Sequence, residues 1–156
     1  MTDIQNPFLT AYDTPHQTTP FHLIKTEHYE PAIEKSMEEY NQEIEAIINN
    51  PETPTFTNTI VALEKSGARL DQVTTVFGNL LSAETNDEMQ AIAERVMPKL
   101  SEHSNNISLN EKLFARIKTV YESTDKEQLN PEERMLLQNT YDGFIRSGAN
   151  LNEVQK

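Results

Sequence analysis

Four histidines are the side chains of this sequence best suited to metal binding or acid–base chemistry. They are His16, His22, His28 and His103. A helix that binds catalytic zinc needs two histidines four residues apart, because that spacing aims both imidazoles at one ion, with a glutamate beside them as the base. No two of the four have this spacing. We therefore predict surface or capping histidines, and a chain that contributes no catalytic, cofactor-binding or metal-binding residue of its own.

The remaining reactive residue types form no recognisable site either. Glu38, Glu39, Glu43 and Glu45 are close in sequence, but in so acidic a chain they predict a solvated helix face. The absence of cysteine excludes disulfides, thiolate zinc sites, iron–sulfur clusters and cysteine nucleophiles. Four glycines without a GxxxxGK or GxGxxG pattern offer no phosphate cradle, and the serines lie in no nucleophile elbow.

The charge balance excludes several kinds of partner. The chain has 25 acidic and 13 basic residues, a formal net charge of -12, which repels nucleic acids and anionic membranes. An acidic surface could attract cationic peptides, although solubility explains it equally well. The N-terminus lacks the basic start and apolar stretch of a secretory signal. We predict a cytoplasmic location, with the periplasm as the alternative if a signal peptide has been removed.

The chain divides into an N-terminal arm and a helical region. We predict that residues 1–27 form an extended arm rich in proline and aromatic residues, and that residues 28–156 form a helical domain. The prolines fix φ and interrupt every possible helix, and the aromatics between them are expected to lie on another surface. These residues are Pro7, Pro15 and Pro20, and Phe8, Tyr12 and Phe21.

Apolar residues with a period of 3.6 predict the helices. The first runs from about residue 29 to 48, and Asn86, Asn110 and Asn130 begin three of the later helices. We expect Pro98 to kink the fourth helix and the methionines to pack in the core. The inward stripes are Tyr29, Ile33, Met37, Tyr40, Ile44 and Ile47; Leu70, Val73, Phe77, Leu80 and Leu81; Met89, Ile92, Ala93, Val96 and Leu100; Leu113, Ile117, Val120 and Tyr121; and Met135, Leu137, Tyr141, Phe144 and Ile145.

A short stretch rich in proline and threonine, NNPETPTFTNTI, separates the first helix from the second. Pro51 and Pro54 stiffen the connection, Thr55 is the predicted N-cap, and Gly67 is the predicted left-handed terminator of the second helix. We hypothesise that this joint fixes the angle between two helices. An ordinary helix-ending and helix-starting connection within a helical hairpin explains the same residues equally well.

Six helices with short links and no strand pattern predict an all-α fold, an antiparallel bundle with an extended arm. Ser147 and Gly148 end the sixth helix. Asn150 or Asn152 then offers a cap for another helix, which is too short to be stable alone. From this feature alone, a frayed tail and a longer parent chain are equally good explanations.

Several stretches, taken in order, resemble a known family. They are NPFLTAYDTPHQTTPFHLIKTEHYEPAIEKSM, EIEAIINNPETPTFTNTIVALEKSG, AETNDEMQAIAERVMPKLSEHSNNISLNEKLFARI and RSGANL. Together they cover nearly the whole chain and are similar to the N-terminal region of bacterial peptidyl-dipeptidases, members of the thimet oligopeptidase family of zinc metallopeptidases. None of them is a catalytic motif.

The resemblance implies a role and a set of partners. Family members are helical, with two lobes around a deep channel, and the N-terminal region supplies wall and roof helices. The catalytic lobe carries HExxH and a further glutamate that bind zinc, and neither is present here. The resemblance therefore implies an N-terminal piece of a zinc enzyme that removes C-terminal dipeptides from short peptides. The piece is expected to be inactive alone and to partner the catalytic lobe of the same parent chain.

One competing function stays open at this point. The chain could be a standalone acidic helical adaptor that binds a protein partner through its aromatic arm. A wall segment that normally docks on a larger lobe should instead expose apolar residues or cover them by self-association.

Overall fold

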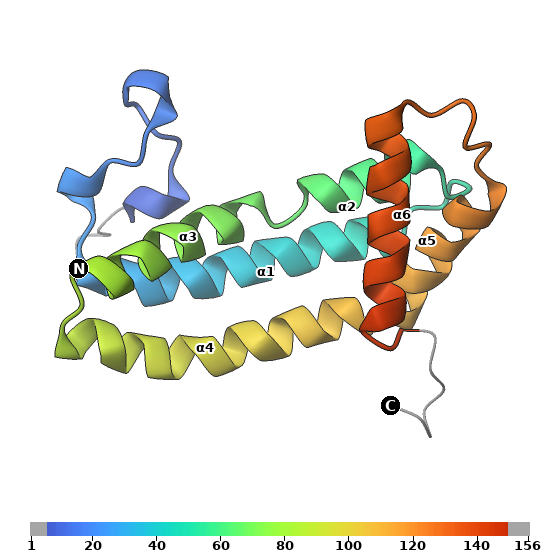
Figure 1. Cartoon of the computed structure of the whole chain (residues 1–156). Coiled ribbons are helices and arrows are strands. Elements are labelled where there is room, and N and C mark those ends of the chain that lie inside the picture. Colours follow the sequence, from blue (N-terminus) through green and yellow to red (C-terminus); the bar gives the residue numbers. More distant parts are fainter. Residues whose placement is uncertain (1–5, 150–156) are drawn as a thin grey trace. The chain divides into compact units, whose positions relative to one another are not determined.

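The computed structural model of the chain describes residues 6–149, which are all-α, with no strand between these two residues. Figure 1 shows the helices in order along the chain. They are α1 (Tyr29–Ile48), α2 (Ala62–Lys65), α3 (Ala68–Ala83), α4 (Asp87–Ser108), α5 (Glu111–Ser123) and α6 (Pro131–Arg146), with a π-helical segment, η5 (Phe56–Val61), directly before α2. No helix among these residues is long and apolar enough to cross a lipid bilayer.

The described residues gather into two compact units. Unit 1 contains residues up to 40 and residues 67–100, and unit 2 contains residues 41–66 and those from 101 onward. Helices α1 and α4 each supply residues to both units. The predicted division into an arm, residues 1–27, and one helical domain, residues 28–156, stays a prediction.

Unit 1 packs α3 against the first halves of α1 and α4. Consecutive helices alternate in direction here, so α1 and α4 run parallel with each other (Figure 1). The predicted stripes supply most of its core, and Val76 joins them without having been predicted. The buried residues are Phe8, Tyr29, Ala32, Ile33, Leu70, Val73, Val76, Phe77, Met89, Ile92 and Val96.

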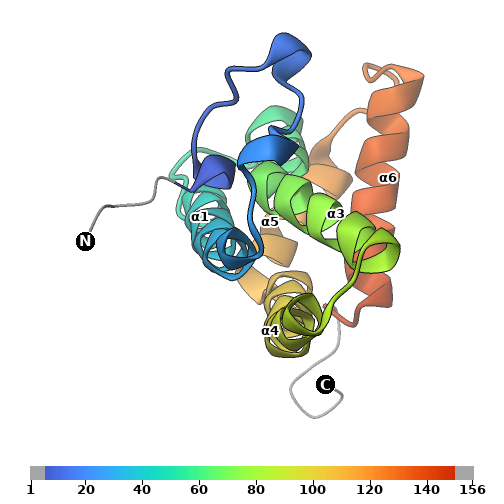
Figure 2. The same ribbon diagram turned by 90° about the vertical axis from the view of Figure 1, so that its left-hand side faces the viewer.

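The arm is not simply extended. It forms four short 3₁₀ turns: η1 (Pro7–Leu9), η2 (Pro15–Gln17), η3 (Phe21–Leu23) and η4 (Thr26–His28). Two of the prolines expected to interrupt helices instead begin turns, because the first turn of a helix needs no N–H from proline. Figure 2 shows the arm, in blue, lying over α1 and α3. Phe8 is buried as predicted, whereas the prediction for Phe21 was wrong, since its side chain is 59% exposed.

Unit 2 is built around α5 and α6, which contact each other and also η5. Phe114 of α5 stacks on Tyr141 and Phe144 of α6, and Tyr121 stacks on Tyr141 with ring centroids 3.9 Å apart. Asn130 and Glu133 form the predicted capping box at the start of α6. Phe114 belongs to the buried face of α5 although it was not predicted there.

Two methionines expected in the core lie at the surface. Met135 is 61% exposed and Met97 is 44% exposed, so the prediction of core packing was wrong for both. Periodicity identifies the face of a helix that is apolar, but not whether another element covers that face. Of the predicted α6 stripe, only Leu137 is fully buried.

The helix boundaries follow the predicted caps. The first helix has the predicted bounds, Asn86 accepts a hydrogen bond from the Met89 N–H, and Asn110 accepts one from the Leu113 N–H. Helix α4 continues through Pro98, and the predicted kink stays a prediction. Gly148 has φ 92°, which suits its predicted role in ending α6. The further helix predicted from Asn150 or Asn152 lies outside the described residues.

The joint between α1 and α3 is the least regular part of the helical region. Thr55 is the N-cap as predicted, and it forms a capping box with Asn58. The residues after it were expected to be α-helical but form the π-helix η5, which is a rare conformation. Gly67 has the predicted left-handed conformation, with φ 74°. Tyr40 packs so closely on it that a Cβ atom there would lie 2.5 Å from the Tyr40 ring.

Candidate functional site

The histidines occupy two kinds of environment. His16 and His22 are exposed on the arm, and His28 and His103 are buried. His28 caps the last 3₁₀ turn, because its Nδ1 accepts the Lys25 N–H at 3.0 Å. Its Nε2 is buried without a hydrogen-bond partner among the described residues. Nδ1 therefore acts as an acceptor within the turn, which is a capping role.

Metal binding requires several side chains that converge on one point. Within residues 6–149, no group of three histidine, aspartate or glutamate side chains is placed to hold an ion. The described part of the chain therefore offers no cluster that could hold the zinc ion, which the resemblance implies is bound in the catalytic lobe.

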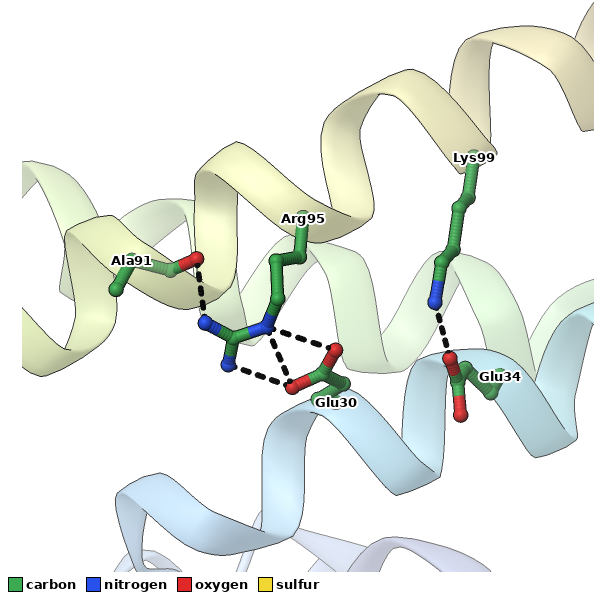
Figure 3. Close-up of polar contacts among 5 residues, drawn as sticks. All are labelled: Glu30, Glu34, Ala91, Arg95 and Lys99. Carbon is green, nitrogen blue, oxygen red and sulfur yellow. Dashed lines mark hydrogen bonds and ion pairs between the residues drawn. The ribbon is translucent and has the colours of Figure 1, made fainter.

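The carboxylates of α1 take part in ion pairs rather than in an acid–base pair. Glu30 and Glu34 lie one turn apart and meet Arg95 and Lys99, which lie one turn apart on α4 (Figure 3). Arg95 holds both oxygens of Glu30, with Nη2 at 2.7 Å from Oε2 and Nε at 3.1 Å from Oε1. These hydrogen bonds lower the pKa of Glu30 below its ordinary value. The two ion pairs, Glu30–Arg95 and Glu34–Lys99, thus align α1 with α4. Arg95 also keeps Glu30 ionised, and an ionised carboxylate does not suit the role of a general acid.

The predicted solvated face of α1 has one exception. Glu38, Glu43 and Glu45 are exposed, but Glu39 is only partly exposed. Its Oε2 forms an ion pair with Nε of Arg69 on α3, at a distance of 2.8 Å. Arg69 also donates from Nη1 to the carbonyl oxygen of Phe8. One guanidinium therefore connects α1, α3 and the arm.

A groove of about 700 Å³ lies between the arm and α3 within unit 1. Its floor includes the buried side chains of Phe8 and Val76. Polar side chains from both elements form its walls, among them Tyr12 of the arm and Gln72 of α3. We call this hollow the arm–α3 groove. No sequence pattern predicted it, because it depends on how the arm folds back over a helix more than forty residues further along the chain.

A second feature, which we call the Arg116 joint, lies in unit 2. The Arg116 guanidinium of α5 donates to the carbonyl oxygens of Asn50 at 2.9 Å and Glu52 at 3.4 Å, and it lies 3.5 Å from Oδ1 of Asn58. Asn58 also donates to the carbonyl oxygen of Thr53. The proline-rich connection is therefore held from both sides, by a cap at η5 and by a cation on α5.

A smaller groove of about 390 Å³ lies beside the Arg116 joint. Residues of the second half of α1, η5 and α2 line it, including Glu43, Asn58 and Lys65. Its walls offer one carboxylate, one ammonium group, the amides of Asn50 and Asn58 and the hydroxyl of Ser66. Glu43 and Lys65 are both exposed here.

The stretches on which the family resemblance depends meet each other in the structure. Arg116, from LNEKLFARI, binds the backbone of NNPETPTFTNTI. The amide of Asn6 donates to the carbonyl oxygen of His28 at 2.8 Å, and the rings of Phe8 and Tyr29 lie 5.2 Å apart. In these contacts, residues of the quoted stretches join one element to another.

Comparison with known proteins gives a consistent result. Residues 33–156 match the family model described as Neurolysin/Thimet oligopeptidase, N-terminal domain. The chain is 41% identical over 151 residues to a dipeptidyl carboxypeptidase of Salmonella typhimurium and 39% identical over 151 residues to one of Escherichia coli. It is 26% identical over 153 residues to oligopeptidase A of Haemophilus influenzae. These alignments cover 97%, 97% and 98% of this chain, but the chain spans only 22% of the length of each relative.

Proposed function

The chain belongs to the neurolysin/thimet oligopeptidase family through its N-terminal domain, and from this premise we propose that it forms a wall of the substrate channel in a peptidase that removes C-terminal dipeptides. The observation that carries the proposal is the identity of 41% and 39% to two proteins named dipeptidyl carboxypeptidase over nearly the whole chain. The residue pairs that join its elements support a rigid scaffold.

We propose that the reactive groups lie elsewhere in a longer protein. A zinc ion bound there would supply Lewis-acid chemistry toward a peptide carbonyl. This chain would supply shape, because the Glu30–Arg95 pair holds helices together within unit 1 and the Arg116 joint holds elements together within unit 2. Its partners would be the catalytic lobe of the same polypeptide and short unfolded peptides. The chain alone is expected not to hydrolyse peptides. Its location in the cytoplasm and its self-association stay predictions.

The decisive experiment compares two proteins, this chain of 156 residues and a longer product of the same reading frame that reaches the expected HExxH. Each is incubated with an N-terminally blocked peptide, and the released dipeptides are identified by mass spectrometry. We expect release by the longer protein only, with loss of activity in the presence of a chelator. A folded protein with the same C-terminal residues should remain intact, because a channel admits unfolded chains only.

Two outcomes would overturn the proposal. A reading frame without any HExxH would favour the standalone adaptor. Chelator-sensitive hydrolysis by the 156-residue chain alone would place the active site within it.

A further inference from the structure

The arm–α3 groove has the mixed surface that a polypeptide backbone needs. Phe8 and Val76 give it an apolar floor, and Gln72 and Thr75 of α3 are exposed on its wall with side chains that can donate and accept hydrogen bonds. Small-molecule and peptide sites combine apolar area with a few polar groups that fix orientation. A surface depression that holds only water does not need this combination of apolar area and orienting polar groups.

The arm presents an unpaired length of backbone to this groove. Thr10 is extended, with φ −116° and ψ 158°, and residues 11–13 have no regular structure. The backbone N–H and C=O groups of Ala11, Tyr12 and Asp13 form no hydrogen bond with other described residues. An extended peptide can pair with such a segment through its own main chain, as peptides do when they add to a sheet edge.

The Tyr12 hydroxyl adds a polar group that lacks a partner. Its oxygen is buried, and no described residue lies in hydrogen-bonding geometry with it. Burial raises the pKa of Tyr12, although a polar contact from the Thr19 side chain, which falls outside ideal hydrogen-bond geometry, and the positive charge of Arg69 offset part of this rise. The hydroxyl therefore stays protonated at neutral pH and can donate to a carbonyl oxygen. A buried donor without an acceptor costs free energy that a ligand can recover.

The turn beside the groove is strained. His16 and Gln17 both have left-handed backbone conformations, with φ 58° and 56°. Such conformations are unfavourable for residues other than glycine and gather at ligand-binding sites and switches. Gln17 lines the groove, and hydrogen bonds from Thr14 and Thr18 close the turn around it. The strain thus fixes one wall of the groove.

Charge restricts the ligand further. Arg69 lines the groove, but its guanidinium already binds Glu39 and the Phe8 carbonyl. Asp71 also lines the groove, is exposed, and forms no ion pair with the other described residues. With a chain charge of -12, the groove disfavours an anionic ligand.

We propose that the arm–α3 groove binds an extended peptide segment without net negative charge, through main-chain hydrogen bonds to residues 11–13 and to the Tyr12 hydroxyl. The choice of a peptide as the ligand rests on the proposed function, because proteins named peptidases are its relatives. The site itself rests on the groove, the unpaired backbone and the buried hydroxyl.

Binding is measured on the 156-residue chain with an acetylated and amidated peptide of about six residues, which spans roughly 20 Å when extended. The peptide carries one lysine and otherwise alanine, glycine and serine. In ¹⁵N-labelled protein, we expect its amide shift changes to gather at residues 10–19 and 68–76. Shift changes elsewhere, or none at millimolar peptide, would overturn the proposal.

Two pairs of variants make the assignment specific. Thr75→Trp fills the groove and should weaken binding at least tenfold, whereas Asn79→Trp, one turn along α3 and also exposed, should leave the affinity within about twofold. Tyr12→Phe removes only the hydroxyl and should weaken binding about fivefold, as expected for one neutral hydrogen bond. Equal effects of the two tryptophans, with native circular dichroism spectra, would contradict the proposal.

The result is separable from the peptidase proposal. If the longer protein releases dipeptides while the groove binds no peptide and Thr75→Trp leaves its KM unchanged, only the groove assignment fails. If the groove binds the peptide while the longer protein is inactive, only the peptidase proposal fails.

Discussion

Arg116 of α5 donates from Nη1 to the carbonyl oxygen of Asn50, 2.9 Å away and 66 residues earlier in the chain. This carbonyl lies two residues beyond the end of α1 at Ile48, directly before Pro51, where no helix continues to supply a backbone N–H for it. A guanidinium can reach several such oxygens at once because its donors form a fixed fork. The Arg116 joint therefore replaces the hydrogen bonds that the proline-rich connection cannot make for itself.

Replacing Arg116 with methionine keeps the stem and removes the donors. We expect the free energy of unfolding to fall by about 1.5–3 kcal/mol, the usual range for hydrogen bonds that involve a charged group. Urea denaturation followed by circular dichroism measures this change. Lys112→Met on the exposed face of the same helix is the matched control and should shift stability by less than about 0.5 kcal/mol. Equal losses in both variants would mean that the joint is not stabilising.

Gly67 should be intolerant of any side chain, whereas Gly78 should accept one. Gly67→Ala places a methyl group in a left-handed conformation and 2.5 Å from the Tyr40 ring, so we expect a loss of at least about 2 kcal/mol. Gly78 lies inside α3, where an added methyl group would meet no described residue within 4 Å, and Gly78→Ala should raise stability by about 0.5–1 kcal/mol. Thermal unfolding of the two variants tests both signs, and a stabilised Gly67→Ala would contradict the close packing.

Local signals allowed much of this fold to be predicted from sequence. The bounds of α1 follow from its stripe and from the residues after Ile48. The N-cap at Thr55 and the capping box of Asn130 with Glu133 follow from local residue types. The box that Thr55 forms with Asn58 was not predicted. The π-helix η5 was not predicted, and its residue Asn58 lies 3.5 Å from Arg116, a partner 58 residues away that local sequence signals do not identify. The same limit applies to the arm–α3 groove, which depends on a contact between Arg69 and Phe8.

Phe8 is the residue of the arm that is expected to contribute most to stability. Phe8 is 1% exposed and packs against Tyr29, so Phe8→Ala should cost about 3–5 kcal/mol by leaving a cavity. Phe21→Ala is the matched control, since Phe21 is 59% exposed, and should change stability by less than about 0.5 kcal/mol. Guanidinium denaturation of both variants measures the difference. A small effect of Phe8→Ala would indicate an arm that folds independently of unit 1.

The Glu30–Arg95 pair predicts a stability change at acidic pH. The hydrogen bond from Arg95 lowers the pKa of Glu30 in the folded state below its ordinary value of 4.5. The unfolded chain therefore binds the proton more readily than the folded chain does. The stabilisation is present above pH 4.5 and disappears as the pH falls through the folded-state pKa.

Glu30→Gln tests this sign directly. The variant should be less stable than the unmodified chain at neutral pH, and the difference should shrink as the pH falls below 4.5 and vanish once Glu30 is protonated in both states. Urea denaturation at a series of pH values gives the two curves. Glu64→Gln, at an exposed position of α2, is the control and should run parallel to the unmodified chain across the series. A gap that widens on acidification would mean that Arg95 does not favour the ionised carboxylate.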